Sequence, residues 1–191
     1  DMTRSRGLGD VYKRQVVDPI DGTNNYALGC SFCAISLALL FDGLPVYGFI
    51  YDHSTKDLLE GGAGYGLYRN QKKIDRDATA ANAQTMVGLH FPMSFNQIEN
   101  LAPLMSKYRA RCIGSSALMA AYAATGYLTG VIDYRVKVWD IAAAYALCAS
   151  VGLKWVFTET SPFPLKQFHP QMGFSPYHAG TGSFIDLMRN L

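Results

Sequence analysis

The chain has 191 residues, of which 49% are hydrophobic and 17% charged, so it can bury a substantial core in one domain or two small ones. No apolar run reaches the roughly 20 residues that cross a bilayer and no secretory signal pattern is found, so we expect no membrane association and a cytoplasmic location. The formal charge of +2 comes entirely from the first 15 residues, and a neutral remainder argues against nucleic-acid binding.

The pattern of the chain changes at two places. Residues 1–15 alternate charged residues with glycine and show no amphipathic period, so we expect a non-native leader there. Near residue 84, strands typical of hairpins give way to strands that alternate with helices. We therefore expect an α+β domain rich in hairpins over residues 16–83 and an α/β domain over residues 84–191.

The stretch Asp18–Tyr26, Asp-Pro-Ile-Asp-Gly-Thr-Asn-Asn-Tyr, holds two carboxylates three residues apart. Val16 and Val17 predict the end of a buried strand, and Pro19 favours an extended conformation for Asp18. Asp-Pro and Asp-Gly are turn formers, so the chain should reverse here and bring both carboxylates to one side. Oxygen ligands of this kind suit Mg²⁺, although an ordinary surface turn uses the same residue types.

The residues after this turn predict an anion site beside the carboxylates. Gly22 lets the backbone come close to a ligand. Thr23 or Asn24 is expected to cap a short helical turn whose free N–H groups point outward and attract an anion. Cation ligands and phosphate donors would then lie side by side.

Antiparallel hairpins are predicted next. Their strands cover residues 32–41, 45–51 and 58–60, with a tight turn at Asp42-Gly43. The spaced glycines at 62, 64 and 66 lead into a short strand and a polar turn rather than a helix, which argues against a dinucleotide-binding loop.

Beyond a polar link at residues 75–84, strands and helices alternate. Strands are predicted over 85–90, 110–113, 127–134, 153–158 and 178–180, and helices from 94 onward, over 117–124, 141–151 and 184–190. Ser94 and Gln97 have the spacing of a capping box. This order predicts a mixed sheet with helices packed against it, and an α+β fold overall.

Three polar positions in this second part are candidate site residues. Asp140 precedes an alanine-rich helical run that stops at Gly152, so we expect an N-cap whose second carboxylate oxygen can meet a cation. The turn at Ser115 and Ser116 offers N–H groups to a ligand or serves as a simple cap. Asp133 either faces a substrate or has a backbone partner within its strand.

The cysteines and histidines predict no metal site of their own. Cys30 and Cys33 lack a second cysteine or histidine pair, and the apolar contexts of Cys112 and Cys148 predict buried free thiols. The four histidines have no ligand spacing and are expected to be structural or exposed.

The Asp18–Tyr26 stretch matches the metal-binding signature of the inositol monophosphatase family of Mg²⁺-dependent phosphatases. Val138–Ala144, Val-Trp-Asp-Ile-Ala-Ala-Ala, resembles the second signature of that family, and Gly61–Asn70 resembles its glycine-rich hairpin. The resemblance runs from Val16 to the C-terminus. It implies a layered α/β sandwich of the sugar-phosphatase type that hydrolyses a phosphate monoester with the help of two or three Mg²⁺ ions and is inhibited by Li⁺.

The resemblance also assigns roles to individual residues. Asp18 would bridge two Mg²⁺ ions and take part in catalysis, Asp21 and Asp140 would complete the second ion site, and the Ile20 carbonyl would help to hold the first ion. The N–H groups of Gly22 and Thr23 would bind phosphate, and Thr23 would orient the attacking water. The substrate pocket would include Ser115, Ser116 and Asp133.

Related phosphatases supply one more ligand, a glutamate from a Gly-Glu-Glu segment upstream of the first strand. This chain does not contain that segment, so we expect impaired activity. Members of the family commonly form homodimers. The expected substrate is inositol monophosphate, with histidinol phosphate, fructose 1,6-bisphosphate and adenosine 3′,5′-bisphosphate as alternatives. A non-catalytic scaffold that binds sugar phosphates or a protein is the alternative from another functional class.

Overall fold

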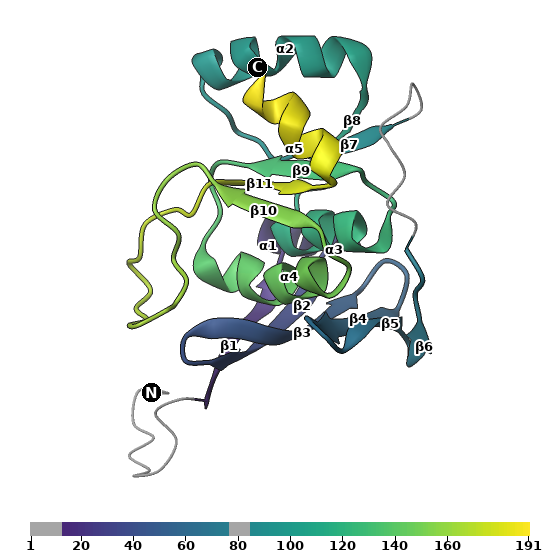
Figure 1. The fold of residues 1–191 in the computed structure, drawn as a ribbon, viewed down its shortest axis with the longest axis vertical. Coiled ribbons are helices and arrows are strands. Elements are labelled where there is room, and N and C mark those ends of the chain that lie inside the picture. The colour runs from purple at the N-terminus through teal and green to yellow at the C-terminus, as the bar shows by residue number, and fades with distance from the viewer. Residues whose placement is uncertain (1–12, 77–84) are drawn as a thin grey trace.

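The computed structural model describes residues 13–76 and 85–191 and arranges them in alternating layers of sheet and helix (Figure 1). The first sheet is antiparallel throughout. Its strands, in spatial order, are β1 (Lys13–Asp21), β2 (Ala34–Phe41), β3 (Leu44–Asp52), β4 (Asp57–Gly62), β5 (Gly66–Arg69) and β6 (Lys72–Lys73). The predicted hairpins are confirmed, and β1 includes residues 13–15 of the segment expected to be a leader.

The second sheet is mixed, as the sequence predicts. Its spatial order is β10 (Lys154–Phe157), β11 (Tyr177–Gly180), β9 (Gly130–Asp133), β7 (Met86–Leu89) and β8 (Arg109–Arg111). The pairs of β7 with β8 and with β9 are parallel, and the other pairs are antiparallel. The parallel pairs place the ends of β7 and β9 at one edge of the sheet.

Five helices complete the described fold: α1 (Thr23–Ala27), α2 (Phe95–Lys107), α3 (Ser116–Thr125), α4 (Val138–Ser150) and α5 (Gly182–Arg189). Helices α3 and α4 lie between the two sheets, and their alanines are buried there (Figure 1). Helices α2 and α5 cover the outer face of the second sheet, where Leu101 and Phe184 pack with Val87 and Ile132. The capping box of Ser94 and Gln97 forms as predicted.

Small residues allow the close packing of α4 on the first sheet. Gly48 of β3 faces this helix, and a Cβ atom at that position would lie only 2.3 Å from the carbonyl oxygen of Ala143. Because real Cβ atoms do not approach a carbonyl that closely, the packing needs glycine here. The missing side chain at Gly48 therefore allows the short distance between the first sheet and α4, the helix that carries Asp140.

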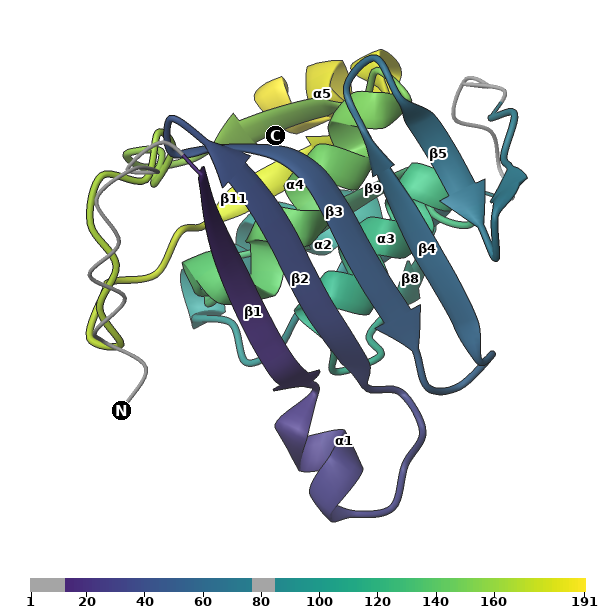
Figure 2. The ribbon, with the colours of Figure 1, turned by 90° about the horizontal axis from the view of Figure 1, so that it is seen from below.

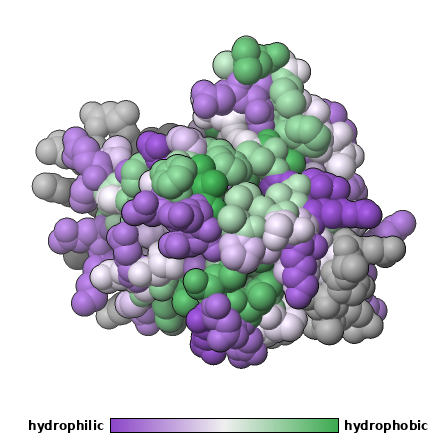
Figure 3. All heavy atoms as spheres, turned by 90° about the horizontal axis from the view of Figure 1, so that it is seen from above, coloured by the Kyte–Doolittle hydropathy of each residue, from purple (hydrophilic) through white to green (hydrophobic). Residues whose placement is uncertain are grey.

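The outer face of the first sheet has no helix over it among the described residues (Figure 2). Alternate residues of β2 and β3 point to this face, and the strand register pairs Ile35 with Tyr51 and Leu37 with Phe49. Ile35 is 41% exposed. The other outer surface, seen from the side of α2 and α5, mixes apolar and polar areas (Figure 3).

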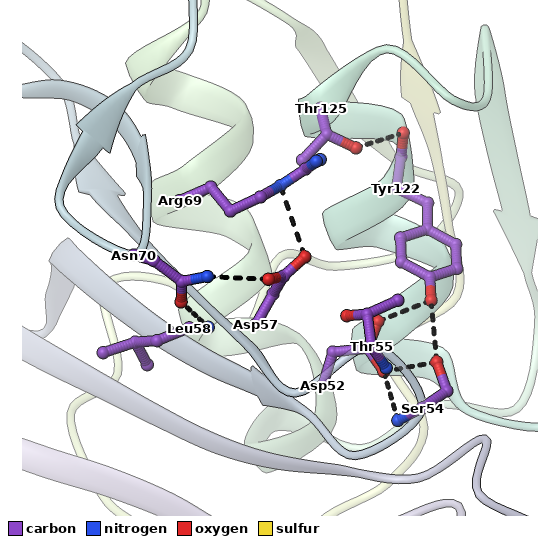
Figure 4. Close-up of polar contacts among 9 residues, drawn as sticks. All are labelled: Asp52, Ser54, Thr55, Asp57, Leu58, Arg69, Asn70, Tyr122 and Thr125. Atoms are coloured by element: carbon purple, nitrogen blue, oxygen red, sulfur yellow. Dashed lines mark hydrogen bonds and ion pairs between the residues drawn. The ribbon is translucent and has the colours of Figure 1, made fainter.

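A polar network ties α3 to the first sheet (Figure 4). Tyr122 of α3 donates a hydrogen bond of 2.6 Å to Asp52 at the end of β3, and Ser54 donates another of 2.6 Å. Burial acts to raise the pKa of Asp52, but the hydrogen bonds from Ser54 and Tyr122 outweigh burial and hold this pKa below its usual value. In the next hairpin, Arg69 pairs with Asp57 at 3.6 Å.

Two simpler expectations have different outcomes. Cys148 is a buried free thiol as predicted, whereas Cys112 is exposed because it follows a short edge strand whose three residues are all exposed. Within residues 13–76 and 85–191, no helix has the length and apolar character needed to span a membrane.

Candidate metal and phosphate site

Three carboxylates from distant parts of the sequence meet between the two halves of the fold. Asp18 and Asp21 lie at the end of β1, and Asp140 lies in the first turn of α4. One oxygen atom from each lies within 4.8 Å of the corresponding oxygens of the other two. Such a separation allows one ion, or a pair of close ions, to contact all three side chains.

The end of β1 is irregular, and this irregularity brings its two carboxylates together. Residues three apart on a regular strand point to opposite faces. Here the pairing with β2 shifts between Asp18 and Asp21, and the Ile20 N–H donates a 3.0 Å hydrogen bond to Oδ1 of Asp18. This local turn is the one that the Asp-Pro and Asp-Gly pairs favour.

Each of the three carboxylates uses one oxygen within the protein. Oδ1 of Asp18 accepts from Ile20, and Oδ2 of Asp21 accepts from the Ala117 N–H at 2.9 Å and from the Ser115 hydroxyl. Oδ2 of Asp140 accepts from the backbone N–H of the residue before α4, at 2.7 Å. The second oxygen of Asp21 has no hydrogen bond within the described part of the chain, and the side chains of Asp18 and Asp140 share a hydrogen bond with each other that needs a proton on one of them. A cation that replaced this proton would meet one oxygen from each of the three acids.

Two predicted helix starts are wrong by a few residues. Helix α4 begins at Val138, so Lys137 is its N-cap and Asp140 is its third residue. Val138 is buried, and the added turn packs it into the core. Helix α1 has Gly22 as its N-cap, not Thr23 or Asn24, because Gly22 adopts a positive φ of 80°.

Burial and mutual repulsion dominate the electrostatics of the cluster. Burial raises the pKa of Asp21 to about 6, against the lowering effect of its hydrogen bonds to Ser115 and Ala117. Burial also raises the pKa of Asp140 to about 8, and the neighbouring Asp21 and Asp18 add to this rise. No lysine, arginine or histidine in the described ranges forms an ion pair with these carboxylates. Acids that lie this close together, with no ion-pair partner among the described residues, fit a hard divalent cation.

These pKa values predict how the metal-free protein responds to pH. In the unfolded chain, Asp21 and Asp140 have a pKa near 3.9, so their raised pKa in the folded state favours folding most below about pH 4. This contribution is lost as the pH rises through about 6 and about 8, because the folded protein must then hold ionised buried acids. In EDTA, we expect urea unfolding to show a free energy of unfolding that falls by a few kcal/mol between pH 5 and pH 8. Asp140→Asn is expected to reduce this slope, and a flat profile for the unmodified chain would contradict the prediction.

Thr23 and Gly22 lie directly after the two carboxylates of β1. The Thr23 hydroxyl donates a 2.9 Å hydrogen bond to the Ile20 carbonyl, so its oxygen can still accept a hydrogen bond from a water molecule. A Cβ atom on Gly22 would lie 2.8 Å from the Phe32 carbonyl oxygen, so no side chain fits there. The first N–H groups of α1 have no side-chain cap. Gly22 is therefore needed for the close packing of this turn on Phe32, and the uncapped N–H groups are the feature that suits an anion.

Ser115 and Ser116 are buried at the start of α3, and their hydroxyl groups bind protein carboxylates. Ser115 is the N-cap of α3 and also donates to Asp21, while Ser116 donates to Asp133 at 2.7 Å. The turn therefore forms the helix cap that the sequence analysis offered as one alternative. Both serine hydroxyl groups already donate their hydrogen to a protein carboxylate.

His90 is a polar residue of this region that the sequence analysis did not single out. It follows β7, and its Nδ1 atom lies 3.5 Å from Oδ2 of Asp133 and 3.3 Å from the Ser116 hydroxyl. His90 directly follows β7, Asp133 ends β9 and Ser116 begins α3, so no short sequence motif connects the three residues. Only the parallel pairing of β7 with β9 places His90 near Asp133.

Comparison with known proteins gives one consistent result. The model of the inositol monophosphatase family matches residues 12–174. The chain is 34% identical over 139 residues to a protein of Methanocaldococcus jannaschii named fructose-1,6-bisphosphatase/inositol-1-monophosphatase, an alignment that covers 72% of the chain and 54% of that protein. It is 30% identical over 166 residues to the inositol-1-monophosphatase of Bacillus subtilis, covering 84% and 63%. The chain thus spans between half and two thirds of these relatives' length.

The fold is also similar to solved structures. The extragenic suppressor protein SuhB of Bartonella henselae superimposes with a TM-score of 0.81 at 27% sequence identity. The superposition covers 94% of this chain and 69% of SuhB. The two sheets and the helices between them are therefore shared with a protein of greater length.

Proposed function

The chain belongs to the inositol monophosphatase family, and on this premise we propose that it hydrolyses phosphate monoesters of small polyols with Mg²⁺. The preferred substrate in this proposal is inositol monophosphate, which yields inositol and phosphate. The observation that carries the proposal is the cluster of Asp18, Asp21 and Asp140, with one oxygen from each within 4.8 Å of the others, beside the uncapped start of α1.

The residues that would hold Mg²⁺ are Asp18, Asp21, Asp140 and the Ile20 carbonyl. When bound, two or three such ions would neutralise phosphate charge, lower the pKa of a water molecule and stabilise the leaving alkoxide. The Ile20 carbonyl accepts one hydrogen bond, from Thr23, and a carbonyl oxygen has a second lone pair for an ion. Inhibition by Li⁺ belongs to the same proposal.

The chain's own groups would bind and orient the reactants. The N–H groups of Gly22 and Thr23 would hold the phosphate oxygens, since they are free of side-chain caps. The Thr23 oxygen would accept a hydrogen bond from the attacking water and so fix its direction. Asp21 keeps its place because α3 holds one of its oxygens through Ser115 and Ala117.

The alcohol part of the ester, opposite its phosphate, would lie near Ser116 and Asp133. Asp133 is fully buried, and burial raises its pKa, although His90 and the hydrogen bond from Ser116 act in the opposite direction. The name of the Methanocaldococcus jannaschii relative favours fructose 1,6-bisphosphate as a second candidate substrate. Cytoplasmic location and homodimer formation stay predictions.

Phosphate release tests the proposal on four esters: inositol 1-phosphate, fructose 1,6-bisphosphate, histidinol phosphate and adenosine 3′,5′-bisphosphate. We expect release that requires Mg²⁺, is fastest with inositol 1-phosphate and is inhibited by Li⁺. Calorimetric titration with Mg²⁺ provides the parallel binding measurement. Absence of both phosphate release and Mg²⁺-dependent heat would refute the proposal and favour the non-catalytic scaffold.

The expected impairment needs a comparison of two chains. The second chain carries, before the 191 residues, a segment with the Gly-Glu-Glu pattern that the family resemblance implies. We expect the longer chain to release phosphate faster than the shorter one. Equal rates would show that the upstream glutamate is not needed.

A further inference from the structure

We propose that His90 recognises the alcohol part of the phosphate ester, with Nε2 of its ring accepting a hydrogen bond from a substrate hydroxyl. In this proposal Asp133 and Ser116 are positioning residues that hold the ring through Nδ1. The inference rests on the proposed function and names the group that selects polyol esters within it.

The hydrogen bonds around Asp133 leave it little capacity for a substrate. Its Oδ1 atom accepts from the Arg135 N–H at 3.0 Å, and its Oδ2 atom accepts from Ser116 at 2.7 Å. The His90 ring also lies against Oδ2. The Asp133 side chain is 0% exposed, whereas that of His90 is 20% exposed. Of these two side chains, only His90 reaches solvent.

The same contacts assign the proton on the ring. Ser116 has one hydroxyl hydrogen, which it donates to Asp133, so its 3.3 Å contact with Nδ1 requires Nδ1 to be the donor. The approach of Nδ1 to a carboxylate oxygen requires the same. We therefore assign the hydrogen to Nδ1, and in the neutral ring Nε2 then carries a lone pair. Neutral imidazole with a fixed Nδ1–H is an acceptor at its outer end.

Nε2 of His90 is open to a further hydrogen bond. It has no hydrogen bond within the described part of the chain, and it is not among the buried atoms that lack a partner. By contrast, Nε2 of His178 is buried and without a partner, as expected for a histidine packed in a core. The two histidines therefore differ in the burial of Nε2, which is enclosed by protein in His178 but not in His90.

The position of His90 fits the alcohol end of the ester. Ser116, which contacts the ring, follows Ser115, which binds Asp21 of the metal and phosphate site. Burial is the main influence on the pKa of Asp21, and His90 is close enough to be one of the lesser ones. Two adjacent residues at the start of α3 thus link the phosphate end to the imidazole. A hydroxyl-bearing alcohol, such as a cyclitol or sugar, offers the donor that Nε2 lacks.

The ring proton can be read directly by NMR of protein with ¹⁵N-labelled histidine. The chain has four histidines, and the signals that disappear in His90→Asn belong to His90. We expect the neutral ring to carry its hydrogen on Nδ1, and Asp133→Asn to shift the tautomer balance. A hydrogen on Nε2 in the free protein would overturn the proposal.

Ligand titration then separates this inference from the proposed function. Inositol 1-phosphate with Ca²⁺ is compared with inorganic phosphate and Ca²⁺, observing Nε2 of His90 and the amides of Gly22 and Thr23. We expect both ligands to shift the amides, and only inositol 1-phosphate to shift Nε2. Shifted amides with an unchanged Nε2 would refute the role of His90 alone. No response at any of these positions would refute the proposed function and the substrate role of His90 with it.

Kinetics provide an independent check with a substrate that has no free hydroxyl. For His90→Asn, we expect the ratio of kcat/KM for inositol 1-phosphate to that for 4-nitrophenyl phosphate to fall about tenfold, as for the loss of one hydrogen bond. This fall should come mainly from a higher KM for the polyol ester. His169→Asn, in an exposed loop, is the control and should keep the ratio of the unmodified chain. An unchanged ratio in His90→Asn would overturn the proposal.

Discussion

Replacing Asp140 with asparagine is expected to weaken Mg²⁺ binding by more than about a hundredfold, because even residues that only support metal ligands cost ten- to a hundredfold. Asparagine keeps the shape and can still accept the Lys137 N–H hydrogen bond, so α4 retains its first turn. It lacks the negative charge that Asp140 adds to the cluster. Phosphate release, if it depends on this cluster, falls with metal binding.

The same substitution should stabilise the metal-free protein. Burial raises the pKa of Asp140 to about 8, so near pH 9 the folded chain holds an ionised acid that it does not stabilise well. Thermal melting in EDTA at that pH should show a higher Tm for Asp140→Asn than for the unmodified chain. Asp186→Asn, on the exposed surface of α5, should change neither Tm nor Mg²⁺ affinity much. Unchanged Mg²⁺ affinity in Asp140→Asn would contradict the assignment of the site.

Replacing Gly48 with alanine is expected to cost about 3 kcal/mol of stability or more. The added methyl group would meet the backbone carbonyl of Ala143 at 2.3 Å, and neither β3 nor α4 has a flexible side chain there that can move away. Helix α4 would have to shift, and Asp140 at its start would shift with it. Urea unfolding measures the loss of stability, and calorimetry should show weaker Mg²⁺ binding as well.

Gly173→Ala is the matched control for that substitution. No atom lies within 4 Å of the position of its added Cβ, and its φ is not in the left-handed region, so we expect little change in stability. If Gly48→Ala were as stable as Gly173→Ala, the close contact between α4 and β3 would be wrong.

Local sequence signals predict much of this fold. The Asp42-Gly43 turn, the Ser94 capping box and the glycine after α4 each depend on residues near one another, and each is found where predicted. Helix starts are less predictable. The first turn of α4 forms because Val138 gains burial in the core, a long-range effect that the alanine-rich run from residue 141 does not reveal.

In the site too, contacts between residues close in sequence were predictable, whereas contacts between distant residues were not. The pair of acids at the end of β1 is visible in a nine-residue stretch, and their meeting with Asp140 was expected only from resemblance to a family. His90 carries no local signal, because its partners Asp133 and Ser116 lie on other elements. Parallel strand pairing between β7 and β9 decides that neighbourhood, and pairing of that kind depends on the whole domain.

The start of α3 connects the two sheets through the hydroxyl groups of two adjacent serines. Ser115 holds a carboxylate of the first sheet, and Ser116 holds one of the second. A tilt of this turn would move both carboxylates together, and with them the proposed cation site and the proposed position of the His90 ring. The orientation of this helix is therefore constrained from two directions at once, by the first sheet through Ser115 and by the second sheet through Ser116.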